Sequence, residues 1–265
     1  MTFPENLLHT AIGASCAMLA GWVIQRRTRD AGIVDVIWAA SLGVAALAAA
    51  ATGEGDPIRR LIVGFIGSLW SLRLSIYLYV DRILRADHED GRYLMLREQW
   101  GDGAQRWFLI FFQVQAFFVL AFATPFFVAA HNTTPFGWLD AAAIAIWSAA
   151  LTGESIADRQ LARFRADPAK KGSTCREGLW AYSRHPNYFF EWVLWLGYLP
   201  LGWAAPQGPW LLALPVMLYL FLTRITGIPF VEARKLEASG EAYRSYVERT
   251  PSFFPRFPKS KESGS

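Results

Sequence analysis

Two pairs of polar side chains stand at helical spacing where apolar segments end or begin. Glu154 and Asp158 close one apolar segment, and Asn187 and Glu191 open another. Residues four apart lie on the same side of a helix, so each pair projects from one face. Carboxylates and an amide can hold ribose hydroxyls and a carboxamide, and the guanidinium of the nearby Arg165 can hold phosphate. Together these side chains are suited to binding a dinucleotide.

Two further charged residues fall inside apolar segments. Asp35 lies in AGIVDVIWAA, and Arg73 lies in the middle of the next segment. An ionised side chain at the centre of a membrane helix costs about 2.5–3.5 kcal/mol on insertion scales, so such residues serve a function or pair with one another. A catalytic role for Asp35 and an ion pair that joins Asp35 to Arg73 are both open at this point.

The composition indicates a polytopic membrane protein. Hydrophobic residues make up 53% of the 265 residues, and charged residues make up 18%, below the roughly 25% usual for soluble domains. A span needs about 20 apolar residues. Seven segments qualify, and they predict an all-α membrane bundle as a single domain over residues 1–258, with a disordered tail at 259–265. The predicted spans are 7–25, 32–52, 61–80, 107–130, 136–153, 188–204 and 209–226.

Charge placement sets the predicted orientation. Lys and Arg gather after the first, third, fifth and seventh spans, whereas the opposite loops hold only Arg59 and Arg60. Positive residues mark the cytoplasmic side, so the N-terminus is predicted outside and the C-terminus in the cytoplasm. Nearly all the polar residues within the spans then lie toward the cytoplasm, where they could line one cavity open to that side.

Several other functional classes find no support in the sequence. The two cysteines, Cys16 and Cys175, are expected at different depths, which argues against a disulfide. His185 precedes Pro186, in the first turn of the sixth span, and the other histidines are too scattered to join it in a metal site. We expect no metal and no nucleic acid, and the basic loops are expected to contact anionic lipid.

At SRHPNYFFEW the chain resembles the steroid 5-alpha-reductase family, in particular its bacterial membrane branch. The resemblance covers most of residues 31–258 and is strongest from residue 150 onward. The blocks that carry it, in chain order, are RYLMLREQWG, FFQVQAFFVLAFATP, GESIADRQLARFR, GLWAYSRHPNYFFEW and GIPFVEARKLEASGEAYRSYVERTPSFFPRFP.

The resemblance implies a seven-helix reductase of a bacterial inner membrane, with NADPH bound from the cytoplasm. That family reduces the C=C bond of an enone, typically a 3-oxo-4-ene steroid, so a hydrophobic steroid-like substrate is expected, and a monomer is the simplest assembly. Glu154 falls where the family often has Asn. The expected cofactor-binding residues are Arg92, Tyr93, Glu154, Asp158, Arg165, Lys171, His185, Asn187, Glu191 and Tyr246.

The catalytic pair expected from the resemblance is Asp35 with Tyr77. The animal enzymes use a Glu on the second span and a Tyr on the third, but the second span here has only Asp35. A carboxylic acid in an apolar cavity can stay protonated and donate to a carbonyl oxygen that gains charge. The family's His and Tyr pair near the C-terminus is also replaced here, by a block containing Glu232, Arg234 and Lys235.

Two other functions remain possible from the sequence. RHPNY followed by VEARKLEASGEAYRSYVERTPSFFP also resembles the isoprenylcysteine and phospholipid methyltransferases, which bind S-adenosylmethionine. Those enzymes usually have fewer spans and lack the GESIADRQ block. A transporter or channel with Asp35 and Arg73 in its path is the third candidate, and the absence of internal repeats argues against it.

Overall fold

The computed structural model is built from helices joined by loops, and it describes residues 1–86 and 88–257. Within those ranges there is no β-strand, which confirms the predicted all-α class. The chain divides into two compact units. Unit 1 comprises Met1–Gly137 and Leu201–Leu211, and unit 2 comprises Trp138–Pro200 and Leu212–Ser265. That one domain spans residues 1–258 stays a prediction, and the predicted tail at 259–265 lies outside the described residues.

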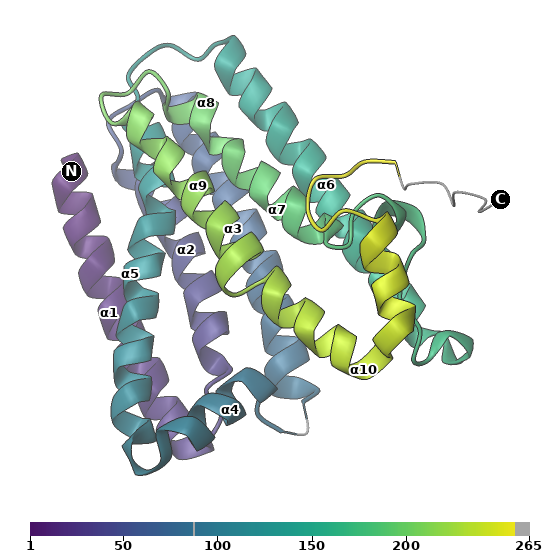
Figure 1. The fold of residues 1–265 in the computed structure, drawn as a ribbon. Coiled ribbons are helices and arrows are strands. Elements are labelled where there is room, and N and C mark those ends of the chain that lie inside the picture. The colour runs from purple at the N-terminus through teal and green to yellow at the C-terminus, as the bar shows by residue number, and fades with distance from the viewer. Residues whose placement is uncertain (87, 258–265) are drawn as a thin grey trace. The chain divides into compact units, whose positions relative to one another are not determined.

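Unit 1 is a bundle of long helices that run side by side (Figure 1). A short helix follows the third long one and leads into the fourth. The helices are α1 (Phe3–Thr28), α2 (Ile33–Thr52), α3 (Pro57–Tyr79), α4 (Gly91–Trp100) and α5 (Ala104–Ala130), with a π-helical turn, η1 (Val80–Leu84), after α3 and a 3₁₀ turn, η2 (Gly101–Gly103), before α5.

The sequence defines where these helices begin. Thr2 and Glu5 form a reciprocal capping box at the start of α1, and the Asp56 carboxylate accepts from the backbone N–H groups of Ile58 and Arg59 at the start of α3. Such caps satisfy backbone donors that the first turn of a helix leaves unpaired. Asp90 does the same for α4 by accepting from the Arg92 N–H, which fixes the start of the segment that carries Arg92 and Tyr93.

Small residues allow α2 and α3 to approach closely. A Cβ atom added at Gly67 would lie 2.5 Å from the Ala46 Cβ, and one added at Gly64 would lie 2.7 Å from the Ala50 Cβ. Close backbone contact between small residues is a common basis of helix association in membranes, where both helices are already surrounded by apolar groups.

Gly67→Val is therefore expected to destabilise unit 1 by about 1–3 kcal/mol, the usual cost of overpacking. The measurement is thermal unfolding of the detergent-solubilised protein. Gly13→Val is the matched control, because nothing lies within 4 Å of a Cβ added there. Equal unfolding temperatures for the two variants would contradict the packing argument.

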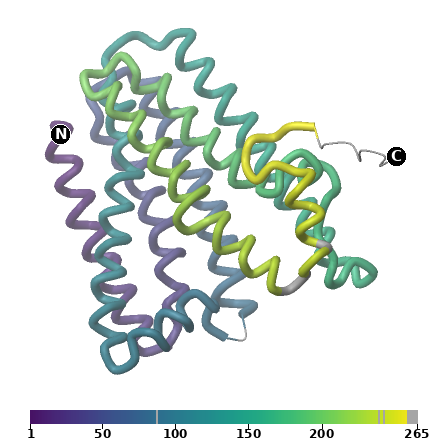
Figure 2. The backbone as a smooth tube through the Cα atoms, in the orientation of Figure 1, coloured from purple at the N-terminus to yellow at the C-terminus, as the bar shows by residue number. Residues whose placement is uncertain are grey.

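Unit 2 is centred on two neighbouring helices, α6 (Trp138–Ala166) and α7 (Pro186–Leu196). Between them the chain reverses through the loop of residues 167–185, so that α7 runs back beside α6 (Figure 2). Two short 3₁₀ turns, η3 (Pro168–Lys170) and η4 (Gly178–Ala181), lie in this loop. The remaining elements of the chain are α8 (Tyr198–Gly202), η5 (Gly208–Leu212), α9 (Ala213–Leu220), the π-helical turn η6 (Phe221–Ile225) and α10 (Ile228–Arg249).

Five helical stretches among the described residues are long and apolar enough to cross a membrane. They coincide with or contain the first four predicted spans and the seventh, to within one residue, which supports an integral multi-pass membrane protein. The stretches are Phe3–Thr28, Ile33–Thr52, Pro57–Leu84, Gly91–Ala130 and Gly208–Glu237. The spans predicted at 136–153 and 188–204 fall on α6 and on α7–α8, which are not among the five, so the count of seven and the orientation stay predictions.

Candidate functional site

The two i,i+4 pairs of the sequence meet across α6 and α7. Asn187 Nδ2 donates to Asp158 Oδ1 at 3.3 Å. Glu154 is buried one turn before Asp158 on α6, and Glu191 follows one turn after Asn187 on α7. The Glu191 carboxylate accepts from Trp195 Nε1 at 2.9 Å. We call Glu154, Asp158, Asn187 and Glu191 the α6–α7 cluster.

Local packing explains why these side chains come together. A Cβ added at Gly153 would lie 2.4 Å from the Phe190 ring, so glycine lets that ring press against α6. The loop before α7 is also fixed to α6, because Trp180 Nε1 donates to the Ala157 carbonyl oxygen at 3.0 Å. Pro186 then occupies the first turn of α7, where its missing N–H costs nothing. Asn187 is thereby held against Asp158.

Two predicted phosphate-binding side chains lie in the same unit. Arg165 is exposed near the end of α6, and Lys171 is exposed in the following loop. Neighbouring Lys170 pairs with Glu177 at 2.6 Å. Carboxylates, an amide and cations are the side-chain types that bind the polar groups of a dinucleotide, and binding of a dinucleotide by this unit stays a prediction.

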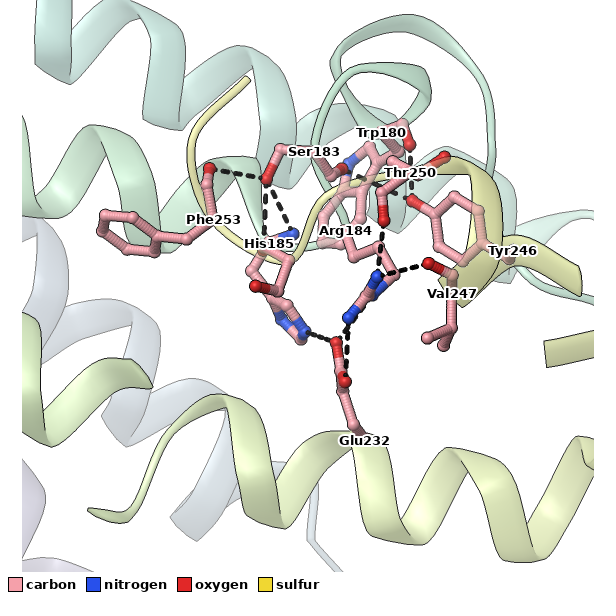
Figure 3. Close-up of polar contacts among 10 residues, drawn as sticks. Trp180, Ser183, Arg184, His185, Glu232, Tyr246, Val247, Thr250 and Phe253 are labelled. Atoms are coloured by element: carbon pink, nitrogen blue, oxygen red, sulfur yellow. Dashed lines mark hydrogen bonds and ion pairs between the residues drawn. The ribbon is translucent and has the colours of Figure 1, made fainter. Parts of the chain in front are cut away.

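A buried arginine organises the entrance to α7 (Figure 3). Arg184 grips both carboxylate oxygens of Glu232 on α10, with Nε–Oε1 at 2.7 Å and Nη2–Oε2 at 3.1 Å. Its Nη1 donates to the carbonyl oxygens of Val247 and Thr250. A forked arrangement of this kind gives strong, directional bonds. We call Arg184, His185, Glu232 and Tyr246 the Arg184 clamp.

His185 and Tyr246 belong to this clamp. His185 Nε2 lies 3.1 Å from Glu232 Oε1, and the Tyr246 hydroxyl donates to the Trp180 carbonyl oxygen. Burial raises the pKa of Tyr246 above its usual value, so it stays a neutral donor. These bonds account for both residues inside the protein, and their predicted contact with a cofactor stays a prediction.

The contacts of the clamp were not predicted from the sequence. Its signal was an Arg directly before His185 together with one acid, Glu232, in the apolar start of α10. The rest of that block is also explained, since Lys235 Nζ lies 5.8 Å over the Trp180 ring and Arg234 lies 5.7 Å over the Phe230 ring. Sequence spacing could not show which acid meets which base, because they are separated by almost fifty residues.

Acidification is expected to weaken the folded state through His185. Burial lowers its pKa from 6.5, and the Glu232 hydrogen bond only partly opposes this effect. The unfolded chain then binds more protons just below pH 6.5, so the stabilisation is complete above that pH and is lost as pH falls toward the folded-state pKa. The unfolding temperature of His185→Gln should fall less between about pH 7.5 and 5.5 than that of wild type. His9→Gln, at an exposed histidine, should behave as wild type; a wild-type slope for His185→Gln would refute the assignment.

Unit 1 holds a separate charged cluster around Asp35. The Asp35 carboxylate pairs with Arg82 in η1 and with Arg92 in α4, the latter at 3.2 Å. The Tyr93 hydroxyl donates to the same oxygen at 2.9 Å. Arg92 also pairs with Asp90, at 3.1 Å. Burial tends to raise the pKa of Asp90, but the hydrogen bonds from Arg92 outweigh this effect and leave that pKa lowered. The apolar setting predicted for Asp35 is therefore wrong, because guanidinium groups surround its carboxylate.

Of the predicted catalytic pair, Asp35 lies on α2 and Tyr77 lies on α3. Tyr77 is 60% exposed, and the Tyr93 hydroxyl bonds to Asp35. Arg82 was missed, because the loop sequence DRILRADHEDGR offers several arginines and only the π-helical turn η1 decides which one faces α2. The catalytic roles of Asp35 and Tyr77 stay predictions.

Within the described residues no three His, Cys, Asp or Glu side chains are grouped to hold a metal ion. The candidate residues fall into two sets, one in each unit. Asp35, Tyr77, Arg92 and Tyr93 belong to unit 1, and the α6–α7 cluster, the two cations and the clamp belong to unit 2.

Comparison with known proteins places the chain in a family. An uncharacterized protein of Schizosaccharomyces pombe is 27% identical over 267 aligned positions, which cover 89% of this chain and 75% of the yeast protein. No solved structure matches the chain. A family model described as "Protein of unknown function (DUF1295)" matches residues 21–250. Because that match covers most of the length of this chain, the chain belongs to the DUF1295 family, a family of steroid 5-alpha-reductase-like membrane proteins.

Proposed function

We propose that the protein is an NADPH-dependent membrane reductase that reduces the C=C bond of an enone lipid, with a 3-oxo-4-ene steroid as the most specific candidate. The observation that carries the proposal is the α6–α7 cluster, in which the Asn187 amide of α7 donates to the Asp158 carboxylate of α6 at 3.3 Å. The steroid 5-alpha-reductase-like character of the family supports it.

The α6–α7 cluster would bind the polar groups next to the nicotinamide. Asn187 can donate and accept at a carboxamide, while Asp158 and Glu191 can accept from ribose hydroxyls. Arg165 and Lys171 are exposed cations of the same unit and would bind phosphates. When bound, NADPH supplies the hydride; the protein supplies position, hydrogen-bond donors and exclusion of water.

The acceptor side of the reaction needs a donor to the enone oxygen, where negative charge develops. A pre-placed hydroxyl in a dry site stabilises such charge strongly. Asp35 and Tyr77 are the residues proposed for this role. Tyr93 is a second tyrosine to test, since it is buried and its hydroxyl donates to Asp35.

The proposed topology has seven spans with the N-terminus outside and the C-terminus in the cytoplasm. The basic loops after the first, third, fifth and seventh predicted spans support this orientation. The cofactor site would then face the cytoplasm of a bacterial inner membrane, where NADPH is available, and a hydrophobic substrate could enter from the bilayer.

Cofactor binding by the purified, detergent-solubilised protein tests the proposal. NADPH is added, and binding is followed by the fluorescence of the reduced nicotinamide. S-adenosylmethionine is added in a parallel calorimetric titration. We expect saturable binding of NADPH, and we expect added NADP⁺ to displace it by competition. Binding of S-adenosylmethionine alone would replace the reductase by a methyltransferase, and binding of neither would remove both enzymes in favour of a transport protein.

A further inference from the structure

Unit 2 contains a polar pocket that the proposed reductase does not use. Its cavity volume is about 400 Å³, and it lies between the end of α9 and the segment that follows α10. The residues that line it are Tyr219, Thr223, Arg224, Pro251, Ser252, Phe253, Phe254 and Arg256.

The chemistry of the lining favours a phosphate group. Arg224 and Arg256 contribute two guanidinium groups to one pocket, and Tyr219 and Ser252 contribute hydroxyls. The Thr223 hydroxyl already donates to the Tyr219 carbonyl oxygen at 2.7 Å, so the arginines are the main donors. Paired guanidinium groups match the oxygens of a phosphate by several charge-assisted hydrogen bonds.

The walls of this pocket are built by tertiary contacts. Ser183 Oγ donates to the Phe253 carbonyl oxygen at 2.9 Å, and the Arg256 N–H donates to the Tyr182 carbonyl oxygen at 3.0 Å. The Phe253 and Tyr219 rings are in edge contact, with centroids 5.3 Å apart. Arg224 itself lies in the π-helical turn η6, a local geometry that is rare and often found at functional sites.

The pocket lies on a different side of α7 from the α6–α7 cluster. Asn187 bonds to α6, whereas Phe189 packs against Phe253 with ring centroids 5.8 Å apart. Residues two apart on a helix point in nearly opposite directions. Trp192 also contacts Phe254, at 5.8 Å. Aromatic rings therefore separate the arginines from the proposed cofactor-binding groups.

The setting of the pocket identifies the source of the phosphate. Arg224 belongs to the stretch Gly208–Glu237, which is long and apolar enough to cross a membrane. Exposed apolar side chains accompany the arginines, namely Ile225, Phe254 and Phe257. Cations that bind head groups beside apolar groups that enter the acyl region are the combination expected at a lipid surface.

We infer that Arg224 and Arg256 form a binding site for the phosphate of an anionic phospholipid head group. The site is separate from the cofactor site and does not depend on the proposed reduction. The lipid phosphate would bridge α9–η6 to the segment after α10, which the Arg184 clamp already ties to the start of α7.

Native mass spectrometry of the full-length protein in detergent tests this inference. Dioleoylphosphatidylglycerol, dioleoylphosphatidylcholine and inorganic phosphate are titrated separately. Arg224→Gln and Arg256→Gln are each expected to weaken phosphatidylglycerol binding by about fivefold, the effect of roughly 1 kcal/mol per arginine near an anionic surface. Arg249→Gln, at an exposed arginine on α10 outside the pocket, should bind phosphatidylglycerol as tightly as wild type does. The wild-type protein should bind phosphatidylcholine more weakly than phosphatidylglycerol.

Three results would overturn the inference. One is unchanged phosphatidylglycerol binding by the double variant Arg224→Gln, Arg256→Gln. Another is displacement of the lipid by inorganic phosphate at comparable concentration, which would indicate a free phosphate site. The third is loss of NADPH binding, rather than lipid binding, in the double variant. If Gln at either position lowers the unfolding temperature, Arg224→Lys and Arg256→Lys keep the charge and should retain the electrostatic part of the lipid affinity.

Discussion

Asn187→Ala is expected to reduce NADPH-dependent turnover of a 3-oxo-4-ene steroid by about 100-fold or more while the protein still inserts into the membrane. The amide of Asn187 is held by Asp158 at 3.3 Å, so it is pre-placed to orient the nicotinamide carboxamide. A misplacement of about 1 Å in a reacting group costs about 100-fold in rate. Turnover is measured from the loss of reduced-nicotinamide absorbance in membranes or detergent.

Glu191→Ala is expected to give a loss of similar size, because this carboxylate stands one turn after Asn187 on α7. Glu241→Ala is the matched control, since that side chain is 83% exposed on α10. Equal amounts of folded protein must be compared, judged by the unfolding temperature of each variant. Near-normal rates in both Asn187→Ala and Glu191→Ala would remove the cofactor assignment from the α6–α7 cluster.

Glu232→Ala is expected to destabilise unit 2 by about 3–5 kcal/mol, the usual cost of leaving one member of a buried ion pair without its partner. The Arg184 side chain is only 8% exposed, and in this variant its guanidinium would lose the carboxylate and keep the carbonyl oxygens of Val247 and Thr250. Thermal or denaturant unfolding of the solubilised protein measures the change. Glu241→Ala again serves as the control, with an expected change below about 1 kcal/mol.

A double variant separates the ion pair from simple loss of packing. Removing both charges, in Arg184→Met with Glu232→Leu, should cost less than Glu232→Ala alone, because replacing a buried pair by apolar groups is often neutral. A double variant that is less stable than Glu232→Ala would show that the carbonyl oxygens capped by Arg184 matter more than the pair. The clamp would then act through α10 and the segment after it.

The sequence was sufficient for the membrane class and for the helix faces that carry the polar pairs of unit 2. Long apolar segments predicted the spans, and five of them are helical stretches able to cross a membrane. The i,i+4 spacing of Asp158 and Asn187 with their partners predicted single faces, and the structure places those two residues in contact. Helical period is a local property, so a single sequence carries it.

The sequence was insufficient wherever a charge had a choice of partners. Asp35 was expected among apolar groups, yet it meets Arg82, Arg92 and Tyr93. His185 was considered alone, yet it shares Glu232 with Arg184. Each of these bonds joins residues distant in the chain, so spacing contains no information about it.

By itself, then, the sequence determined the helical class, the apolar segments, the caps of Thr2, Asp56 and Asp90, and the faces that carry the acids and the amide. These features depend on residues within a few turns of one another. Only the tertiary structure decided which buried charges are paired and where the two arginines of the phosphate pocket meet. An ion pair or pocket is stable only when packing brings its groups within a few ångströms and removes water, and that geometry is a property of the folded helices together.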